Sequence, residues 1–402
     1  MLSNPRLPLL LCVLALLGSG AGSTRAESWW SRIFDTRPAG SQSAKDLEKA
    51  TTVTVGEITG ATGATAAGAL TAQLATSDQV RLLDKGARFN ITGKSVGGRI
   101  SGRLADRKGK TIFERTYAAP GLDDNVRALA DDIIFAITGR PGIATSRITF
   151  VSDLSGTKQI YVCDADGQNI QQVSHQAHGA VSPAIANDGS MMAYTGYDSG
   201  FSDVVVIDMG AGQERQVAST PGMNTGAAFS PDGHRLALTL SFVGSPEIFV
   251  LDLENGHAIC VTESIGVPSS PTWHPDGRRL IFSANEGLGP QLYVADTTSE
   301  AASVRWASGY GFATDPEWSP DGSQVAFTAR VGDDWAVVAK GYPNGPAQVL
   351  QRGGAQHPTW SPDGRSLAYV QHGQLWVQDL ATGRRHSIVS GHGDLSEPRW
   401  KR

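Results

Sequence analysis

One motif recurs five times in the C-terminal part of the sequence, and it limits the fold more than any other feature. Its full form is a Pro, an aromatic residue and the turn Ser-Pro-Asp-Gly, followed by an apolar segment, as in residues 358–369. The Asp of the motif stands at positions 188, 232, 276, 321 and 363, so the spacings are 44, 44, 45 and 42 residues. A period near 43 is typical of propeller blades that have four β-strands each.

The turn has a clear stereochemical role. Proline fixes φ at the second position of the turn, Asp suits the third position, and Gly accepts the left-handed conformation of the fourth. This chemistry predicts a tight connection between a first and a second antiparallel strand. A third strand recurs as an apolar-aromatic segment that ends in Asp, as in Ile160–Asp164, and a fourth strand ends each unit.

The number of blades follows from incomplete repeats at the two limits of the repeat region. Third strands number six, but complete Asp-Gly turns number five. Residues 397–400 resemble a first strand without its turn, and residues 147–151 resemble a second strand without its first. We therefore predict a six-bladed propeller over residues 143–402, closed by pairing of 397–400 with 147–151, because closure removes open sheet edges.

Residues 24–142 have a different pattern, which predicts a small α/β domain. Residues 51–58 and 80–83 are strand-like, residues 61–74 are Ala-rich and helical, and residues 94–116 alternate like a hairpin. Residues 126–138 have helical spacing and are followed by Gly139, a typical helix end. The expected fold class is therefore an α+β N-terminal domain followed by an all-β six-bladed propeller.

The first 23 residues have the pattern of a signal peptide. Arg6 precedes an eleven-residue apolar run, Leu7–Leu17, and small residues follow. The run is too short for an ordinary membrane-spanning helix, and no later segment reaches 18 apolar residues, so no membrane span is expected. Of the later cysteines, Cys163 and Cys260 could form one bridge, but their positions two repeats apart favour two small buried side chains on separate strands.

Composition and motifs argue against several classes of function. The chain carries 34 Lys and Arg against 39 Asp and Glu, a formal charge of −5, which disfavours a nucleic-acid binder. A P-loop and a dinucleotide fingerprint are missing from the sequence. The Asp164–Gly167 segment lacks the further ligands of a calcium loop. His175 and His178 are three residues apart, but they lie at a strand end rather than on a helix, so we do not expect them to bind zinc together. We expect no cofactor, no metal and no catalysis.

The order of these parts resembles the TolB-like family, the periplasmic components of the Tol–Pal envelope system. Local similarity is strongest at Ile137–Gly142 leading into Thr145–Val151, and at Arg215–Ser219 leading into Ala228–Gly233. The resemblance implies a monomeric, non-catalytic periplasmic adaptor that supports envelope integrity and outer-membrane constriction at cell division. It implies a Pal-like lipoprotein as partner on one propeller face, and a TolA-like inner-membrane protein as partner of the mature N-terminus, where Trp29 and Trp30 suit a docking peptide.

The segments that lead into the innermost strands are expected to surround one mouth of the channel. Residues Met223–Gly226 and Val267–Ser270 occupy positions where TolB-like sequences carry Pal contacts, with Met223 and Ser270 departing from the family's His and Glu. The predicted partner-binding residues are His178, Met223, Asn224, Thr225, Gly226, Val267, Ser269, Ser270, Thr314, Asp315, His357 and Glu397. The alternative is an exported enzyme or small-ligand binder that uses the channel, with Asp315, His357 and Glu397 as its cluster.

Overall fold

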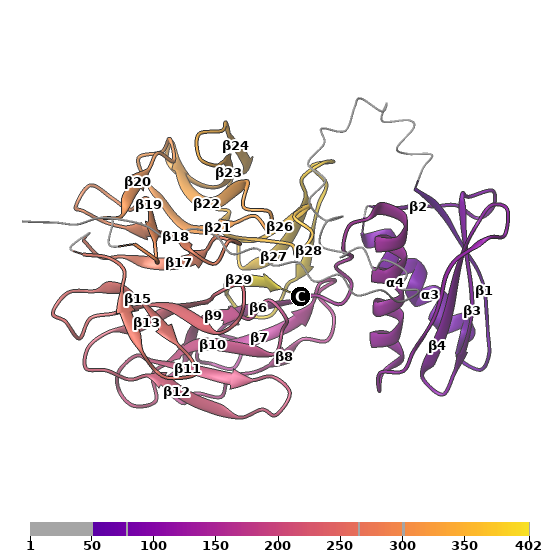
Figure 1. Ribbon diagram of the computed structural model, residues 1–402, viewed down its shortest axis with the longest axis horizontal. Coiled ribbons are helices and arrows are strands. Elements are labelled where there is room, and N and C mark those ends of the chain that lie inside the picture. The colour runs from indigo at the N-terminus through magenta and orange to yellow at the C-terminus, as the bar shows by residue number, and fades with distance from the viewer. Residues whose placement is uncertain (1–50, 78, 264–265, 300–301, 402) are drawn as a thin grey trace, which may run out of the picture. The chain divides into compact units, whose positions relative to one another are not determined.

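The computed structural model describes residues 51–77, 79–263, 266–299 and 302–401 (Figure 1). These residues form a five-stranded sheet with two helices, followed by six four-stranded sheets. The predicted fold class, an α+β domain followed by a six-bladed propeller, is confirmed. The predicted signal peptide and the Trp29–Trp30 segment lie outside the described residues.

The α/β domain has a sheet in the order β2-β1-β3-β4-β5. Both helices pack on it: Leu70 and Leu74 of α3 and Leu129 of α4 are fully buried. Gly102 makes room for this contact, because a Cβ there would lie 2.5 Å from Leu129 Cδ1. The elements are β1 (Thr52–Thr59), α3 (Gly63–Thr76), β2 (Arg81–Leu82), β3 (Phe89–Val96), β4 (Arg99–Asp106), β5 (Thr111–Tyr117) and α4 (Leu122–Thr138).

Two details of this domain follow from turn chemistry. The predicted hairpin over 94–116 is in fact part of three strands, because Gly97-Gly98 and Gly109 mark two separate turns with positive φ. Gly139 ends α4 as predicted: its φ is 72° and its N–H donates to Phe135 O at 2.8 Å.

Each propeller sheet has four antiparallel strands, with the first strand innermost. Blades 1 to 3 consist of β29 (Leu395–Lys401), β6 (Arg147–Ser152), β7 (Gln159–Asp164) and β8 (Gln171–Gln172); β9 (Ala180–Ile185), β10 (Met191–Gly196), β11 (Asp203–Asp208) and β12 (Glu214–Ala218); and β13 (Asn224–Phe229), β14 (Arg235–Leu240), β15 (Glu247–Asp252) and β16 (Ala258–Cys260). Blades 4 to 6 consist of β17 (Ser269–Trp273), β18 (Arg279–Ala284), β19 (Gln291–Asp296) and β20 (Val304–Trp306); β21 (Ala313–Trp318), β22 (Gln324–Val331), β23 (Asp334–Gly341) and β24 (Ala347–Gln351); and β25 (Gln356–Trp360), β26 (Ser366–Gln371), β27 (Gln374–Asp379) and β28 (Arg385–Val389).

Blade 1 is assembled from segments that are far apart in the sequence. Strand β29 pairs antiparallel with β6, so that Trp400 lies opposite Ile148 and Lys401 opposite Arg147. Trp400 is 1% exposed, and its indole N–H donates to Ser146 Oγ at 2.7 Å. The blade therefore joins residues about 250 positions apart through a buried aromatic side chain.

The repeated turns are closed by their own side chains. In the copy at 361–364, Ser361 Oγ donates to Asp363 Oδ1 at 2.6 Å, and that oxygen also accepts from Arg365 N at 3.1 Å. Gly364 has φ 70°, a left-handed conformation that favours glycine. The copy at 319–322 repeats these contacts, so the Asp residues are turn formers.

The first-strand aromatic residues pack between blades. The Trp273 indole donates to Ala228 O of blade 3 at 3.1 Å, and the Trp360 indole donates to Glu317 O of blade 5 at 3.2 Å.

The prediction that both cysteines are buried is half wrong. Both cysteines are free, but only Cys163 is buried; Cys260 is exposed because it ends the short outermost strand β16.

Among the described residues, neither helix combines the length and the apolar character that crossing a membrane requires.

Candidate functional site

A ring of six residues surrounds one mouth of the propeller channel. Each innermost strand carries one residue with positive φ, between 48° and 68°, at a point where its pairing register shifts. The mouth ring consists of Ser182, Gly226, Ser270, Asp315, His357 and Glu397. Non-glycine residues in this conformation cost roughly 1–3 kcal/mol each, and such strain gathers at functional sites.

Contacts between neighbouring blades hold the mouth ring together. Glu397 Oε2 of blade 1 accepts a hydrogen bond from Ser182 N of blade 2 at 2.7 Å. Ser270 Oγ of blade 4 donates to Asp315 Oδ1 of blade 5 at 3.3 Å. Asp315 Oδ2 in turn lies 3.2 Å from Nδ1 of His357 in blade 6. The sequence analysis placed these segments in loops before the innermost strands, but most of them lie within the strands. At each of these positions a β-bulge interrupts the regular pairing of the strand.

Asp315 and His357 form an ion pair that is largely withdrawn from solvent, with side chains 15% and 25% exposed. Burial opposes the charged form of His357, but the Asp315 carboxylate outweighs it and raises the pKa of His357. Burial likewise opposes the charged form of Asp315, but the charge and hydrogen bond of His357 lower the pKa of that carboxyl. Both groups are therefore charged together near pH 6.

We expect the contribution of this pair to stability to depend on pH. Because the pKa of His357 is raised on folding, its contribution is full below the ordinary pKa of 6.5 and is lost as pH rises through the raised value. Urea titrations should show His357→Gln less stable than the native chain by roughly 1–2 kcal/mol at pH 6, with a clearly smaller difference at pH 9. A difference that stays constant or grows with pH would contradict the pairing.

Charge is distributed unevenly around the channel. Blades 5, 6 and 1 contribute Asp315, His357 and Glu397 to the mouth ring, whereas blades 2, 3 and 4 contribute Ser182, Gly226 and Ser270. One half of the inner wall at this mouth is thus charged, and the other half is neutral.

An arc of exposed apolar side chains lies on the neutral half of the same face. Leu240 pairs with both Asn224 and Glu247, so the loop at 241–246 lies where β13 begins, beside the mouth. The same geometry in blades 2 and 4 brings the loops after β10 and β18 to this face. The apolar arc consists of Tyr197, Phe201, Met223, Phe242, Val243, Val267 and Leu288, which are 36–96% exposed.

The predicted partner-binding residues divide into three groups. His178, Met223 and Val267 are exposed, while Thr225, Gly226, Ser269, Ser270, Thr314, Asp315, His357 and Glu397 are half-buried around the mouth. Asn224 is 0% exposed, and its amide donates to Ser202 O and Thr220 O, so it fixes the chain before β13 and cannot contact a partner. Sequence reasoning missed Phe201, Phe242 and Leu288, although apolar residues in polar loops signal such a surface.

His178 contacts Asp198, which lies in the loop after β10. His178 N donates to Asp198 Oδ1 at 2.9 Å, and its exposed imidazole lies 3.5 Å from the same oxygen. Within residues 51–77, 79–263, 266–299 and 302–401, no group of three His, Cys, Asp or Glu side chains is arranged to hold a metal.

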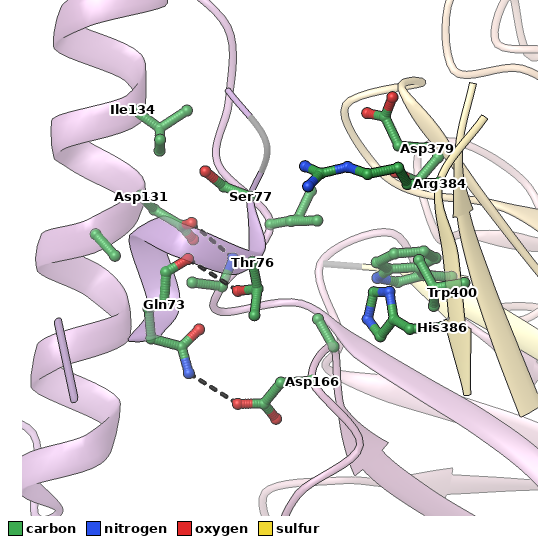
Figure 2. A pocket seen from close by; sticks show the side chains of 16 residues that line it. Gln73, Thr76, Ser77, Asp131, Ile134, Asp166, Asp379, Arg384, His386 and Trp400 are labelled. Atoms are coloured by element: carbon green, nitrogen blue, oxygen red, sulfur yellow. Dashed lines mark hydrogen bonds between the residues drawn. The ribbon is translucent and has the colours of Figure 1, made fainter. Parts of the chain in front are cut away.

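The Asp164–Gly167 turn joins the propeller to the α/β domain. Arg127 of α4 forms a buried ion pair with Asp164 and lies 3.4 Å from Asp166 Oδ2. Gln73 of α3 donates to Asp166 at 2.8 Å (Figure 2). The cavity beside these contacts has a volume of about 50 Å³, which suits a few waters rather than an organic ligand. The turn therefore fastens the α/β domain through its two acidic residues.

The fold and the mouth define a class: a propeller with an α/β N-terminal domain and one face that is partly charged and partly apolar. The profile of the family described as "TolB beta propeller domain" matches residues 135–369. The chain belongs to this family.

Comparisons with individual proteins agree. The Tol-Pal system protein TolB of Desulfosudis oleivorans is 37% identical over 128 residues, 30% of this chain and 29% of that protein. A TolB homolog of Chlorobaculum tepidum is 32% identical over 115 residues, 28% and 26% of the two chains. The matches thus span less than a third of these relatives. TolB from Acinetobacter baumannii has the same fold, with a TM-score of 0.76 at 22% identity over 87% of this chain and 96% of that one.

Proposed function

We propose that this protein is a non-catalytic periplasmic adaptor of a Tol–Pal system, and that its mouth face binds a Pal-like peptidoglycan-associated lipoprotein. In this role it would support envelope integrity and outer-membrane constriction during cell division. Membership of the TolB family and relatives named as Tol-Pal system proteins support this assignment.

The observation that carries the proposal is the combination of two features on one face. The apolar arc exposes seven large side chains on three consecutive blades, a grouping that marks protein interaction sites rather than scattered surface residues. The mouth ring beside it supplies charged and polar groups held by strained backbone. An apolar surface next to fixed polar groups provides both affinity and orientation for a protein partner.

We expect Met223→Asp combined with Val267→Asp to weaken binding of the partner at least 10-fold. The two residues are 38% and 51% exposed, and a charge in an apolar contact loses its hydration without a partner. The measurement is calorimetric titration of the mature chain with the soluble portion of the Pal-like lipoprotein from the same organism.

A matched control carries the same charge change away from the mouth. Ile259 and Val304 are 53% and 68% exposed on the outermost strands β16 and β20. The double variant Ile259→Asp with Val304→Asp should bind as the native chain does. Equal loss in both double variants would move the interface away from the mouth face, and no binding by the native chain would overturn the Tol–Pal assignment.

The proposal extends to the segment at 27–34, which would engage a TolA-like inner-membrane protein through Trp29 and Trp30.

The rival function, small-ligand chemistry at the mouth, rests on the proximity of Asp315 and His357. Glu397 acts on His357 through its charge alone, while its Oε2 accepts the hydrogen bond of Ser182 N. The two charges satisfy each other, which favours a role in shaping the partner surface.

A further inference from the structure

A second cavity lies at the opposite end of the channel, where the Ser-Pro-Asp-Gly turns are. Its volume is about 300 Å³, at the lower limit for small-molecule sites. Its lining includes the turn prolines and the residues Trp273, Trp318, Trp360 and Trp400, which are 1–6% exposed. We call it the turn-end cavity. The apolar walls are interrupted by three charged side chains: Glu317, Arg399 and Lys401.

Arg399 has donors to spare. In the part of the chain that the structure describes, its side chain donates to Pro398 O at 2.8 Å, and no ion pair within 4 Å links it to a carboxylate. Asp315, the nearby acid that acts on it electrostatically, is paired with His357. A guanidinium with free donors beside a cavity is suited to a carboxylate.

Lys401 and Glu317 define the remainder of the polar surface. Lys401 Nζ of blade 1 lies 3.0 Å from Glu317 Oε1 of blade 5. The other oxygen, Glu317 Oε2, is buried without a hydrogen-bond partner among the described residues, as is the neighbouring Trp318 Nε1. Native structures rarely leave such atoms unsatisfied, so each one calls for a ligand or water. With two cations and one anion, the cavity has a net charge of +1.

We propose that the turn-end cavity binds a terminal α-carboxylate together with its adjacent amide N–H and an apolar side chain. Arg399 and Lys401 hold the carboxylate, and Glu317 accepts the hydrogen bond of the N–H. The turn prolines contact the side chain. This chemistry is shared by the last residue of a peptide and by a free N-acylated amino acid. The residues that would hold the ligand differ from those proposed to bind the lipoprotein, so the ligand titration tests this site separately from the proposed function.

The test uses the four tryptophans as reporters. Titration of the mature chain with N-acetylleucine should change the tryptophan fluorescence saturably, with a millimolar or lower Kd, whereas N-acetylleucinamide, which lacks the carboxylate, should not. Arg399→Gln should weaken binding about 10-fold to 100-fold. Lys401→Gln, near the end of the chain, provides a second variant, with an expected loss of about 3-fold to 10-fold.

A matched control and a second probe complete the design. Arg330 is 55% exposed at the end of β22, so Arg330→Gln should leave the titration unchanged. An eight-residue peptide that ends in a free leucine distinguishes the two sources of the carboxylate. If this peptide binds as tightly as N-acetylleucine, the ligand is the C-terminal residue of a peptide. If only N-acetylleucine binds, the ligand is a free N-acylated amino acid. Absence of saturable binding by either probe, or unchanged affinity in folded Arg399→Gln and Lys401→Gln, would overturn the proposal.

Discussion

Trp400→Ala should lower the free energy of unfolding by about 3–5 kcal/mol, the range for removing a fully buried Trp. Trp400 is 1% exposed and belongs to the apolar cluster shared by blades 1 and 6. The substitution also removes the hydrogen bond from its indole to Ser146 Oγ. Because Trp400 lies in the strand that completes blade 1, the loss acts where the ring closes. Urea titration followed by far-ultraviolet circular dichroism measures the change.

Two comparisons show whether the effect depends on burial. Trp360 occupies the equivalent position in blade 6, where all four strands are consecutive, and is 2% exposed. A similar loss in Trp360→Ala indicates that the closing blade is packed as firmly as a continuous one. Phe201 is 69% exposed, so Phe201→Ala should change stability by less than about 0.5 kcal/mol. A loss below about 1 kcal/mol in Trp400→Ala would contradict firm closure of the ring.

The propeller was predictable because its turns are chemically explicit. Each Asp-Gly pair fixes a turn by local hydrogen bonds, so the period could be counted without knowledge of the packing. The strands at 94–116 were harder to separate, because β5 has no fully buried side chain and so lacks a sharp apolar alternation. Where the signal depended on local turn geometry the prediction succeeded, and where it depended on burial by distant elements it became less sharp.

The mouth was predictable in position but not in detail. The spacing of the repeats placed Asp315, His357 and Glu397 on neighbouring blades, but it could not show that His357 pairs with Asp315 while Glu397 binds Ser182. These contacts depend on left-handed residues before proline, a position where extended backbone is the usual expectation. Asn224 was misplaced for a related reason: its role as a buried loop anchor depends on Ser202, in the preceding blade.

We expect Arg127→Ala to lower the free energy of unfolding by about 3–5 kcal/mol, because it leaves the carboxylates of Asp164 and Asp166 without their cation. The Arg127 and Asp164 side chains are only 8% and 12% exposed, so water screens their interaction weakly. The variant should also speed thermolysin cleavage between α4 and β6, since the ion pair joins α4 to the β7–β8 turn. Urea titration and timed proteolysis measure the two effects.

The size of this effect distinguishes a buried fastening from a surface contact. Arg115 pairs with Asp132 at 2.7 Å in the same domain, but its side chain is 61% exposed, so Arg115→Ala should cost less than about 1 kcal/mol. A double-mutant cycle with Asp164→Asn isolates the coupling, because the double variant removes both charges and should recover part of the loss. Equal costs for Arg127→Ala and Arg115→Ala would contradict the fastening. A large, coupled cost would instead establish that the Asp164–Gly167 turn evolved as an anchor for α4, which explains its two acidic residues without a metal.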